Sequence, residues 1–482
     1  MTFSAIYAKI GFVCSHYTQY IKEDKIMNSK DNRSSFSGKI GFVLSAAGAS
    51  VGLGNIWRFP YLAAKYGGGI FLLIYIVLAL TFGYTMIVAE SALGRMTRKS
   101  PVSAFQSFGK KKWMSFGGWI NAVIPILIVP YYSVIGGWVI KYLLEYIRGD
   151  GAKLAEDGYF STFISDDAST ELCFVLFCMF TLVIIFAGVR NGVERVSKLM
   201  MPVLVVLSVI IAVYSVTRPG ALAGVKYFLV PNPANFSWMT VVTAMGQMFY
   251  SLSIAMGILI TFGSYMKKET SIEGSTKNVE IFDTAIAIMA GLMIIPAVFA
   301  FSGGDPDTLQ AGPALMFITI PKVFANMGLG TFVGILFFLL VLFAAVTSSI
   351  ALTESAVSTF EDELGWNRRK STVLVGVIMI ALGSLSSLGY GPLANIRIIG
   401  MQFLDFFDFL TNSVMMPVAA LMTSLLVSRV IGIDRMEEEI LHGEGTFRRK
   451  KIFVLMIKYL CPVFTMIILA SSVANAFGWI SM

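Results

Sequence analysis

The sequence predicts an all-α protein that crosses a membrane many times. Of its 482 residues, 56% are hydrophobic and 14% are charged, and the mean hydropathy is +0.75. A soluble domain typically carries about 25% charged residues, so this composition excludes one. The apolar runs are long and continuous, whereas a membrane β-barrel has short segments of alternating polarity. A polytopic helical membrane protein is the class that remains.

Eleven apolar runs predict eleven membrane-spanning helices, because roughly 20 apolar residues are needed to cross the hydrocarbon core. An odd number of spans puts the two termini on opposite sides, and we expect the N-terminus in the cytoplasm and the C-terminus outside. The predicted spans are 40–66, 69–93, 115–147, 171–188, 199–217, 238–265, 280–302, 331–360, 372–388, 399–428 and 452–476.

The positions of the basic residues predict the orientation of the chain. By count, about 27 of the 37 Lys and Arg residues lie in the segments 1–39, 94–113, 189–198, 267–280, 361–371 and 428–451. The loops between them are acidic or neutral, which is the positive-inside pattern. The net charge of +8 therefore orients the chain and does not indicate a nucleic-acid partner. We expect a multi-pass protein of the plasma (inner) membrane, surrounded by lipid, as a monomer or a dimer.

The segments between the spans complete the predicted organisation. Residues 1–38 are polar, and within them 1–26 are either an extension or an untranslated stretch ahead of a start at Met27. Residues 303–330 contain an apolar stretch too short to span, so we expect a helical hairpin over an extracellular vestibule. The expected parts are a cytoplasmic segment (1–38), a five-helix repeat (39–217), an extracellular loop (218–237), a second five-helix repeat (238–428), a cytoplasmic loop (429–451) and the last helix with the C-terminus (452–482).

The first predicted span carries a stretch that a lipid-facing helix would not accept. Between Gly48 and Pro60 it holds three glycines within seven residues, then Asn55 and Arg58. Glycine costs a helix interior roughly 1 kcal/mol against alanine, and proline about 3. Backbone groups freed by an unwound turn need partners in hydrocarbon, and a bound ion or solute supplies them.

The sixth predicted span repeats this anomaly. Glycines at 246 and 257 flank a segment with hydroxyls at Tyr250, Ser251 and Ser253. Two interrupted helices five spans apart indicate an inverted-repeat transporter with a binding site at the membrane midplane. The alternative is a pair of ordinary kinks in a large helical bundle.

Two further features mark candidate ligands for a small cation. Thr347 and Ser348 are adjacent hydroxyls in the eighth span, although such hydroxyls often bond only to their own helix. Asp283 lies near the start of the seventh span, where an acid is costly unless it meets a cation or a partner. Asp283 thus favours the cation interpretation.

Cysteine and histidine offer no catalytic chemistry. The chain has four Cys and two His, and Cys173 and Cys178 share one apolar run without a nearby His. Buried thiols are the simple interpretation, and neither a transition-metal site nor a nucleophilic triad is predicted. We therefore expect no enzyme and no organic cofactor.

These residues together resemble the neurotransmitter:sodium symporter family. The string GxxVGLGNxWRFPYLxxxxGGGxFLxxY runs from Gly48 to Tyr75, and Thr347-Ser-Ser-Ile is followed by Phe360-Glu-Asp-Glu-Leu. The match covers nearly the whole chain after about residue 33. The resemblance implies the leucine-transporter (LeuT) fold: an all-α, five-plus-five inverted repeat with discontinuous helices 1 and 6, plus an eleventh helix. The chain is similar to the eleven-span bacterial branch of this family, which includes transporters of hydrophobic and aromatic amino acids.

The resemblance also implies where two co-transported sodium ions and an amino acid would bind. The first sodium would meet Ser50, Asn55, Ser251, Asp283 and the substrate carboxylate, and the second Gly48, Val51, Ala344, Thr347 and Ser348. All are hard oxygen donors, which suit Na⁺. Leu53, Gly54 and Tyr132 would bind the substrate carboxylate, and the amine would lie near Ala49, Tyr250 and Ser253. The remaining substrate-binding residues would be Ser50, Met256, Ser348 and Leu352.

Two gates are implied in the same way. Arg58 and Asp405 would pair above the site, with Gln247 beside them and Tyr250 as a lid. Arg33 and Asp362 would pair across the cytoplasmic mouth, next to Tyr265. Exposed ion pairs are worth roughly 0–1 kcal/mol, which suits a contact that must break in every cycle.

Three departures from better-known members refine the expectation. Asp283 stands where they have asparagine, and Ala287 stands where animal relatives have a chloride-binding serine. A fixed negative charge would replace chloride, so we expect chloride-independent transport. Met256 stands where the leucine transporter has phenylalanine, and a slimmer, adaptable side chain leaves room for large apolar or aromatic substrates. The predicted function is sodium-coupled import of such L-amino acids by alternating access; the alternatives are a transport-inactive amino-acid sensor and a cation channel.

Overall fold

The first predicted span is a broken helix in the computed structural model, which describes residues 33–109, 111–302, 312–443 and 445–479. Its first half is α2 (Lys39–Ser50), and its second half is the π-helical turn η1 (Gly54–Arg58) followed by α3 (Phe59–Lys65). The two halves are bent by 54°. The helix ends because Val51 adopts an extended conformation, with φ −76° and ψ 95°. The predicted interruption is therefore present.

The sixth span is broken as well, between α13 (Trp238–Ser251) and α14 (Ile258–Ser264). A capping box of Ser237 and Thr240 begins α13, since each side chain accepts a hydrogen bond from the other residue's backbone N–H. Within the break, Ser253 (φ 52°) and Ala255 (φ 59°) are left-handed, a conformation that non-glycine residues rarely adopt. This strained backbone lies beside the first break.

The other spans are continuous helices. Four belong to the first half of the chain: α4–η2–α5 (Gly69–Leu78, Ala79–Gly83, Tyr84–Thr97), α7 (Lys112–Arg148), α10 (Asp167–Phe186) and η3–α11 (Val189–Glu194, Arg195–Val216). The second half contributes α15 (Ile272–Ser302), α17 (Gly330–Leu364), α18–η7 (Arg368–Ser387, Leu388–Tyr390), α19–η8–α20–η9 (Phe403–Asp408, Phe409–Met415, Met416–Leu425, Leu426–Ile431) and α22–η10–α23 (Lys450–Leu455, Met456–Leu460, Cys461–Ala476).

Among the described residues, nine continuous helices are long and apolar enough to span a membrane, and α2 with η1–α3 forms a tenth span as a bent pair. The predicted span 238–265 corresponds to the broken pair α13 and α14, which is not among these ten. The seventh begins earlier than predicted, at Ile272 instead of residue 280. Glu273 in the added turns accepts a hydrogen bond from the backbone N–H of Arg449, and Glu280, at the predicted start, accepts one from the Arg449 guanidinium.

Short helices join the spans. They are α6 (Pro101–Gln106), α8 (Gly151–Leu154), α9 (Tyr159–Ile164), α12 (Ala221–Leu229), η4 (Pro233–Asn235) and α21 (Ile433–Leu441). Of the predicted hairpin 303–330, the second part forms η6 (Leu315–Thr319) and α16 (Ile320–Ala325). Residues 303–311, like residues 1–26 and the rest of 1–32, lie outside the described residues.

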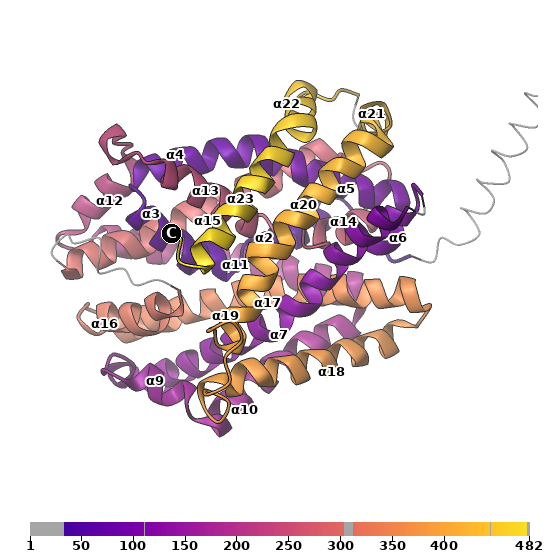
Figure 1. Cartoon of the computed structure of the whole chain (residues 1–482). Coiled ribbons are helices and arrows are strands. Elements are labelled where there is room, and N and C mark those ends of the chain that lie inside the picture. The colour runs from indigo at the N-terminus through magenta and orange to yellow at the C-terminus, as the bar shows by residue number, and fades with distance from the viewer. Residues whose placement is uncertain (1–32, 110, 303–311, 444, 480–482) are drawn as a thin grey trace, which may run out of the picture. The chain divides into compact units, whose positions relative to one another are not determined.

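Residues 36–482 form one unit by their contacts, and residues 1–35 form another. Within the larger unit, α17 packs on α7 and on α2, while α10 and α18 pack on both α7 and α17 (Figure 1). Helix α15 packs on α2 and α11. Both broken helices thus lie among α5, α7, α15 and α17, where every neighbour offers side chains to the breaks.

The outer faces of the bundle are apolar, as expected for contact with lipid. Helix α10 leaves Leu172, Leu176 and Val183 exposed on one side, at the spacing of one helix face. Cys173 and Cys178 on the same helix are buried free thiols, as expected. The fold is that of a multi-pass membrane protein.

Candidate functional site

The two helix breaks meet around one small cavity, the central cavity. Its walls come from residues 49, 50 and 52–55 of the first break, from Tyr250, Ser251, Ser253 and Met256 of the second, and from α7 and α17. Its volume is about 30 Å³. That is room for about two water molecules, so an amino acid enters only if side chains move.

A buried carboxylate, Asp283 of α15, lies at one end of the breaks. Its Oδ1 accepts hydrogen bonds from Asn55 Nδ2 (2.8 Å) and from Ser251 Oγ (2.9 Å). Its Oδ2 accepts one from the Tyr75 hydroxyl (2.7 Å). Three of the residues predicted for the first sodium site are therefore in contact. Tyr75 was missed as a functional residue, although it is the last position of the quoted motif.

A second group of oxygens lies where α2 ends against α17. Ser348 Oγ donates toward the carbonyls of Gly48 (3.3 Å), Ala49 (3.2 Å) and Val51 (3.4 Å). Thr347 Oγ1 donates toward the carbonyls of Phe343 (3.0 Å) and Ala344 (3.1 Å). A Cβ at Gly48 would lie 3.2 Å from Thr347 Cβ, which shows how closely the two helices approach. All five residues predicted for the second sodium site thus lie together.

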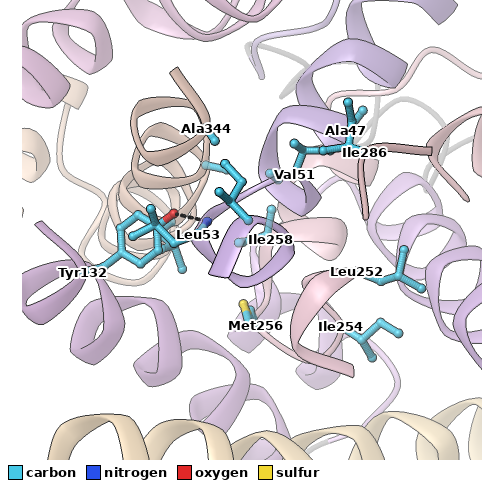
Figure 2. Packing of buried hydrophobic residues seen from close by; sticks show 14 of the residues in the cluster. Ala47, Val51, Leu53, Tyr132, Leu252, Ile254, Met256, Ile258, Ile286 and Ala344 are labelled. Atoms are coloured by element: carbon cyan, nitrogen blue, oxygen red, sulfur yellow. Dashed lines mark hydrogen bonds between the residues drawn. The ribbon is translucent and has the colours of Figure 1, made fainter. Parts of the chain in front are cut away.

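Backbone groups of the first break face the central cavity. The Leu53 N–H donates to the Tyr132 hydroxyl at 3.3 Å, and Met256 and Ile258 lie close by (Figure 2). Ser253 Oγ donates to the Ala49 carbonyl at 3.0 Å and so ties the two breaks together. An added Cβ at Gly54 would lie 2.4 Å from the Tyr250 ring, so only glycine allows this ring to cover the break.

Apolar side chains form the rest of the central cavity. They are Ile128, Met256, Ile258 and Leu352. Ile128 and Ile258 were missed by the sequence analysis. Ile128 precedes Tyr132 by four residues and therefore shares its helix face, which is the signal that would have found it.

A larger cavity of about 530 Å³, the vestibule, lies beyond Tyr132 and Tyr250, which line both cavities. Arg58, Asp405 and Asp408 line it. We call this side of the molecule outer, following the orientation predicted from the charges. Arg58 stacks over the Tyr250 ring, 5.2 Å from the centroid.

The predicted Arg58–Asp405 pair is not formed in this conformation. Within the described residues, no ion pair of 4.0 Å or less joins Arg58 to either acid, and the charge of Arg58 acts on Asp408, one turn after Asp405. Asp408 was missed by the sequence analysis. Gln247 donates from Nε2 to the Gly54 carbonyl at 3.0 Å and thus lies beside the break. The outer gate remains a prediction.

The inner mouth is held by hydrogen bonds between helices. Asp362 accepts from the Ser100 N–H at 2.6 Å. The Tyr265 hydroxyl donates to Glu354 at 2.8 Å, and buried Glu354 pairs with Arg368. Glu354 and Arg368 were missed because both lie near predicted helix ends. Arg33 belongs to the separate unit 1–35, so its pairing with Asp362 stays a prediction.

A further buried acid supports the second break. Glu90 of α5 is fully buried and accepts the N–H of left-handed Ala255 at 2.8 Å. It holds the strained backbone from below. Sequence reasoning missed this acid, although it sits within an apolar run.

The oxygens around the breaks suit a hard cation. Within the described ranges, no group of three or more His, Cys, Asp or Glu residues lies together. The polar groups are one carboxylate, several hydroxyls and free carbonyls, a donor set that fits Na⁺ better than a transition metal.

Comparison with known proteins gives a consistent result. The model of the sodium:neurotransmitter symporter family matches residues 33–152 and 160–478. The chain is 33% identical over 413 residues to the uncharacterized sodium-dependent transporter YhdH of Bacillus subtilis, covering 85% of this chain and 91% of that protein. It is 31% identical over 455 residues to an uncharacterized sodium-dependent transporter of Haemophilus influenzae, covering 91% and 98%.

The fold has a solved counterpart. The crystal structure of MhsT in complex with L-phenylalanine matches with a TM-score of 0.82 and 34% sequence identity, covering 92% of this chain and all of that one (100%). The predicted all-α, LeuT-like fold is therefore confirmed.

Proposed function

The chain belongs to the sodium:neurotransmitter symporter family, whose members are transporters and not enzymes, and we propose that it imports amino acids together with sodium by alternating access. The relatives described as sodium-dependent transporters support the sodium coupling. The observation that carries the proposal is the meeting of the two helix breaks around Asp283. A midplane site between discontinuous helices is how such transporters bind both ion and solute.

The first sodium would bind between Ser50, Asn55, Ser251 and Asp283. Asp283 supplies a full negative charge, and Asn55 and Ser251 would turn their oxygens toward the ion. The second would bind among the carbonyls of Gly48, Val51 and Ala344 and the hydroxyls of Thr347 and Ser348. Support comes from the hydrogen bonds that already bring these oxygens together.

The amino acid would occupy the central cavity. Its carboxylate would replace the Leu53–Tyr132 contact, accepting from the Leu53 and Gly54 N–H groups and from the Tyr132 hydroxyl. Its amine would meet the carbonyls near Ala49 and Tyr250 and the Ser253 hydroxyl. Because the first sodium and the substrate carboxylate would be in contact, each would strengthen the binding of the other.

A large apolar or aromatic side chain is the preferred substrate class. The walls formed by Ile128, Met256, Ile258 and Leu352 are apolar, and methionine adapts to different shapes. MhsT, at 34% identity, was crystallised with L-phenylalanine. Transport would not need chloride, since Asp283 carries the negative charge and Ala287 has no side-chain oxygen.

Two gates would alternate. Arg58 and Tyr250 would close the outer side against Asp408 or Asp405, with Gln247 beside them. Arg33, Asp362 and Tyr265 would close the cytoplasmic side. The N-terminus would lie in the cytoplasm and the C-terminus outside the plasma membrane.

The proposal is tested by uptake of labelled amino acids into liposomes that contain the purified protein, with and without an inward sodium gradient. We expect sodium-driven accumulation of L-phenylalanine, L-tryptophan, L-tyrosine or L-leucine, and weak competition by glycine and L-alanine. Binding without accumulation would indicate a sensor. Sodium current without labelled uptake would indicate a channel.

A further inference from the structure

The two vestibule acids on α19 differ in how firmly they are held. Asp405 is exposed and makes no hydrogen bond or ion pair with any part of the chain that the structure describes. Asp408 is half-buried, and its Oδ1 accepts from Asn412 Nδ2 (2.5 Å) and from the Tyr131 hydroxyl (3.2 Å). Only one of the two carboxylates therefore has a fixed orientation.

The three side chains form a closed ring. The amide of Asn412 has two protons, one directed to Asp408 Oδ1 and one to the Tyr131 hydroxyl at 3.3 Å. The Tyr131 hydroxyl lies 3.2 Å from Asp408 Oδ1 and 3.4 Å from Thr411 Oγ1, and it can donate its proton to either oxygen because Thr411 donates its own to the Phe407 carbonyl. Asp408 Oδ1 thus accepts from two neighbours, which restrict the rotation of its carboxylate.

The backbone of the ring is specialised. Asn412 lies in the π-helical turn η8 (Phe409–Met415), which follows Asp408 directly. A π-helical turn widens the helix and shifts the residues after it around the axis, and such turns are frequent at functional sites. Asn412 follows Asp408 by four residues, so the two side chains share a helix face, and Asn412 also reaches Tyr131 of α7.

The second oxygen of Asp408, Oδ2, accepts no hydrogen bond from the residues that the structure describes. Both donors use Oδ1, and Asp408 lines the vestibule together with Arg58. A carboxylate that is already immobilised loses less side-chain entropy when it pairs, so it holds a partner better than a mobile one. Asp405 lacks this advantage.

We infer that Tyr131 is a positioning residue. Together with Asn412 it fixes Asp408 as the acceptor for Arg58, and it thereby sets how long the outer lid stays closed over a bound amino acid. The inference rests on the proposed function and adds a residue to it. Tyr132 follows directly and faces the central cavity. The same turn of α7 therefore presents the Tyr131 hydroxyl to Asp408 and the Tyr132 hydroxyl to the substrate site.

The test measures dissociation of tritiated L-phenylalanine from the purified full-length protein in sodium. We expect Tyr131→Phe to release it about fivefold faster, with an association rate within about twofold of wild type, since exposed or half-exposed pairs are worth up to about 1 kcal/mol. Asn412→Ala should release it about threefold faster. The control is Tyr142→Phe on the same helix, whose hydroxyl donates to the Phe317 carbonyl at 2.9 Å; its rate should equal wild type.

A double-mutant cycle separates positioning from general loosening. If Tyr131 acts through Asp408, then Tyr131→Phe combined with Asp408→Asn should release no faster than Asp408→Asn alone. Additive effects, or an unchanged release rate in both Tyr131→Phe and Asn412→Ala, would overturn the inference. The proposed function would stand in that case if the wild-type protein still bound L-phenylalanine in sodium. A wild-type protein that retains no L-phenylalanine in sodium would overturn both.

Discussion

The outer and inner sides of the central cavity are closed by different kinds of contact. On the outer side, Arg58, Asp405 and Asp408 line a vestibule of about 530 Å³ without an ion pair of 4.0 Å or less among these described residues. On the inner side, Tyr265 and half-buried Arg368 both donate hydrogen bonds to buried Glu354. Buried Glu194 likewise accepts from the Ser37 N–H at 2.9 Å, just ahead of α2, and pairs with Lys198.

With the orientation predicted from the charges, we propose that this difference marks an outward-facing conformation. Exposed ion pairs contribute roughly 0–1 kcal/mol, whereas breaking a buried pair costs about 3–5 kcal/mol. The outer side therefore opens and closes by side-chain movement, and the inner side must break several buried contacts at once. We expect the energetic barrier of the transport cycle on the inner side.

The largest effect should come from removing the carboxylate of Asp283, which lies between the outer and inner sides. Asp283→Ala leaves Asn55, Tyr75 and Ser251 without their acceptor, and hydrogen bonds to a charged group are worth about 1.5–3 kcal/mol each. We expect sodium affinity and L-phenylalanine affinity to fall together by about a hundredfold or more, measured by equilibrium binding. Binding that kept its dependence on sodium would contradict the role of Asp283.

The next effect should come from the inner chain of contacts. Glu354→Gln leaves half-buried Arg368 without its counter-charge, so we expect about 1.5–3 kcal/mol less stability and a lower melting temperature. Ser355 is buried against Thr261. In the Glu354→Gln background, Ser355→Cys should react faster with a thiol reagent than Ser355→Cys alone.

Glu363→Gln is the control for the inner chain. Glu363 is only partly buried and accepts a hydrogen bond from Ser103 Oγ at 2.7 Å. Glu363→Gln should therefore change neither the melting temperature nor the thiol reaction rate of Ser355→Cys. If both variants behaved like wild type, the inner side would not be held by Glu354, and the contrast between the two sides would be wrong.

A smaller effect is expected on the outer side. Arg58→Ala should accelerate L-phenylalanine release by about fivefold, at least as much as Tyr131→Phe, and raised salt should reduce the difference between variant and wild type, because charges that are partly open to solvent are screened. An acceleration of release above a hundredfold would show that the outer gate is as strong as the inner one.

The smallest effect should follow replacement of chloride by gluconate. We expect liposome uptake to change by less than about twofold, since the carboxylate of Asp283 and the methyl group of Ala287 leave no role for the anion. Collapse of uptake would contradict chloride independence. Asp283→Asn in the same assay would show whether removing the fixed charge creates a chloride requirement.

The parts of the site that break a rule of membrane helices could be predicted from the sequence. Glycines and a proline in one span, hydroxyls between glycines in another and an acid at membrane depth each conflict with a lipid-facing helix. The spans themselves were predicted from hydropathy, because long apolar runs fit the hydrocarbon core. These signals are local, so they needed no knowledge of packing.

Residues whose role depends on packing could not be found this way. Tyr75 lies in an apolar run and resembles any buried tyrosine, and only the fold brings its hydroxyl to Asp283. The choice between Asp405 and Asp408 depends on their neighbours, because Asp408, unlike Asp405, accepts hydrogen bonds from Tyr131 and Asn412 in the part of the chain that the structure describes. Glu354 and Arg368 resemble ordinary polar residues near helix ends until α17 and α18 bring them together.

The three donors around Asp283 have a consequence for the return of the empty carrier. When sodium leaves, the carboxylate keeps hydrogen bonds from Asn55, Ser251 and Tyr75 and is not left as a bare buried charge. We propose that an unloaded protein can therefore reset its conformation without a replacement cation. Net uptake should then proceed without an amino acid on the far side, and Tyr75→Phe should slow net uptake more than exchange of internal for external amino acid.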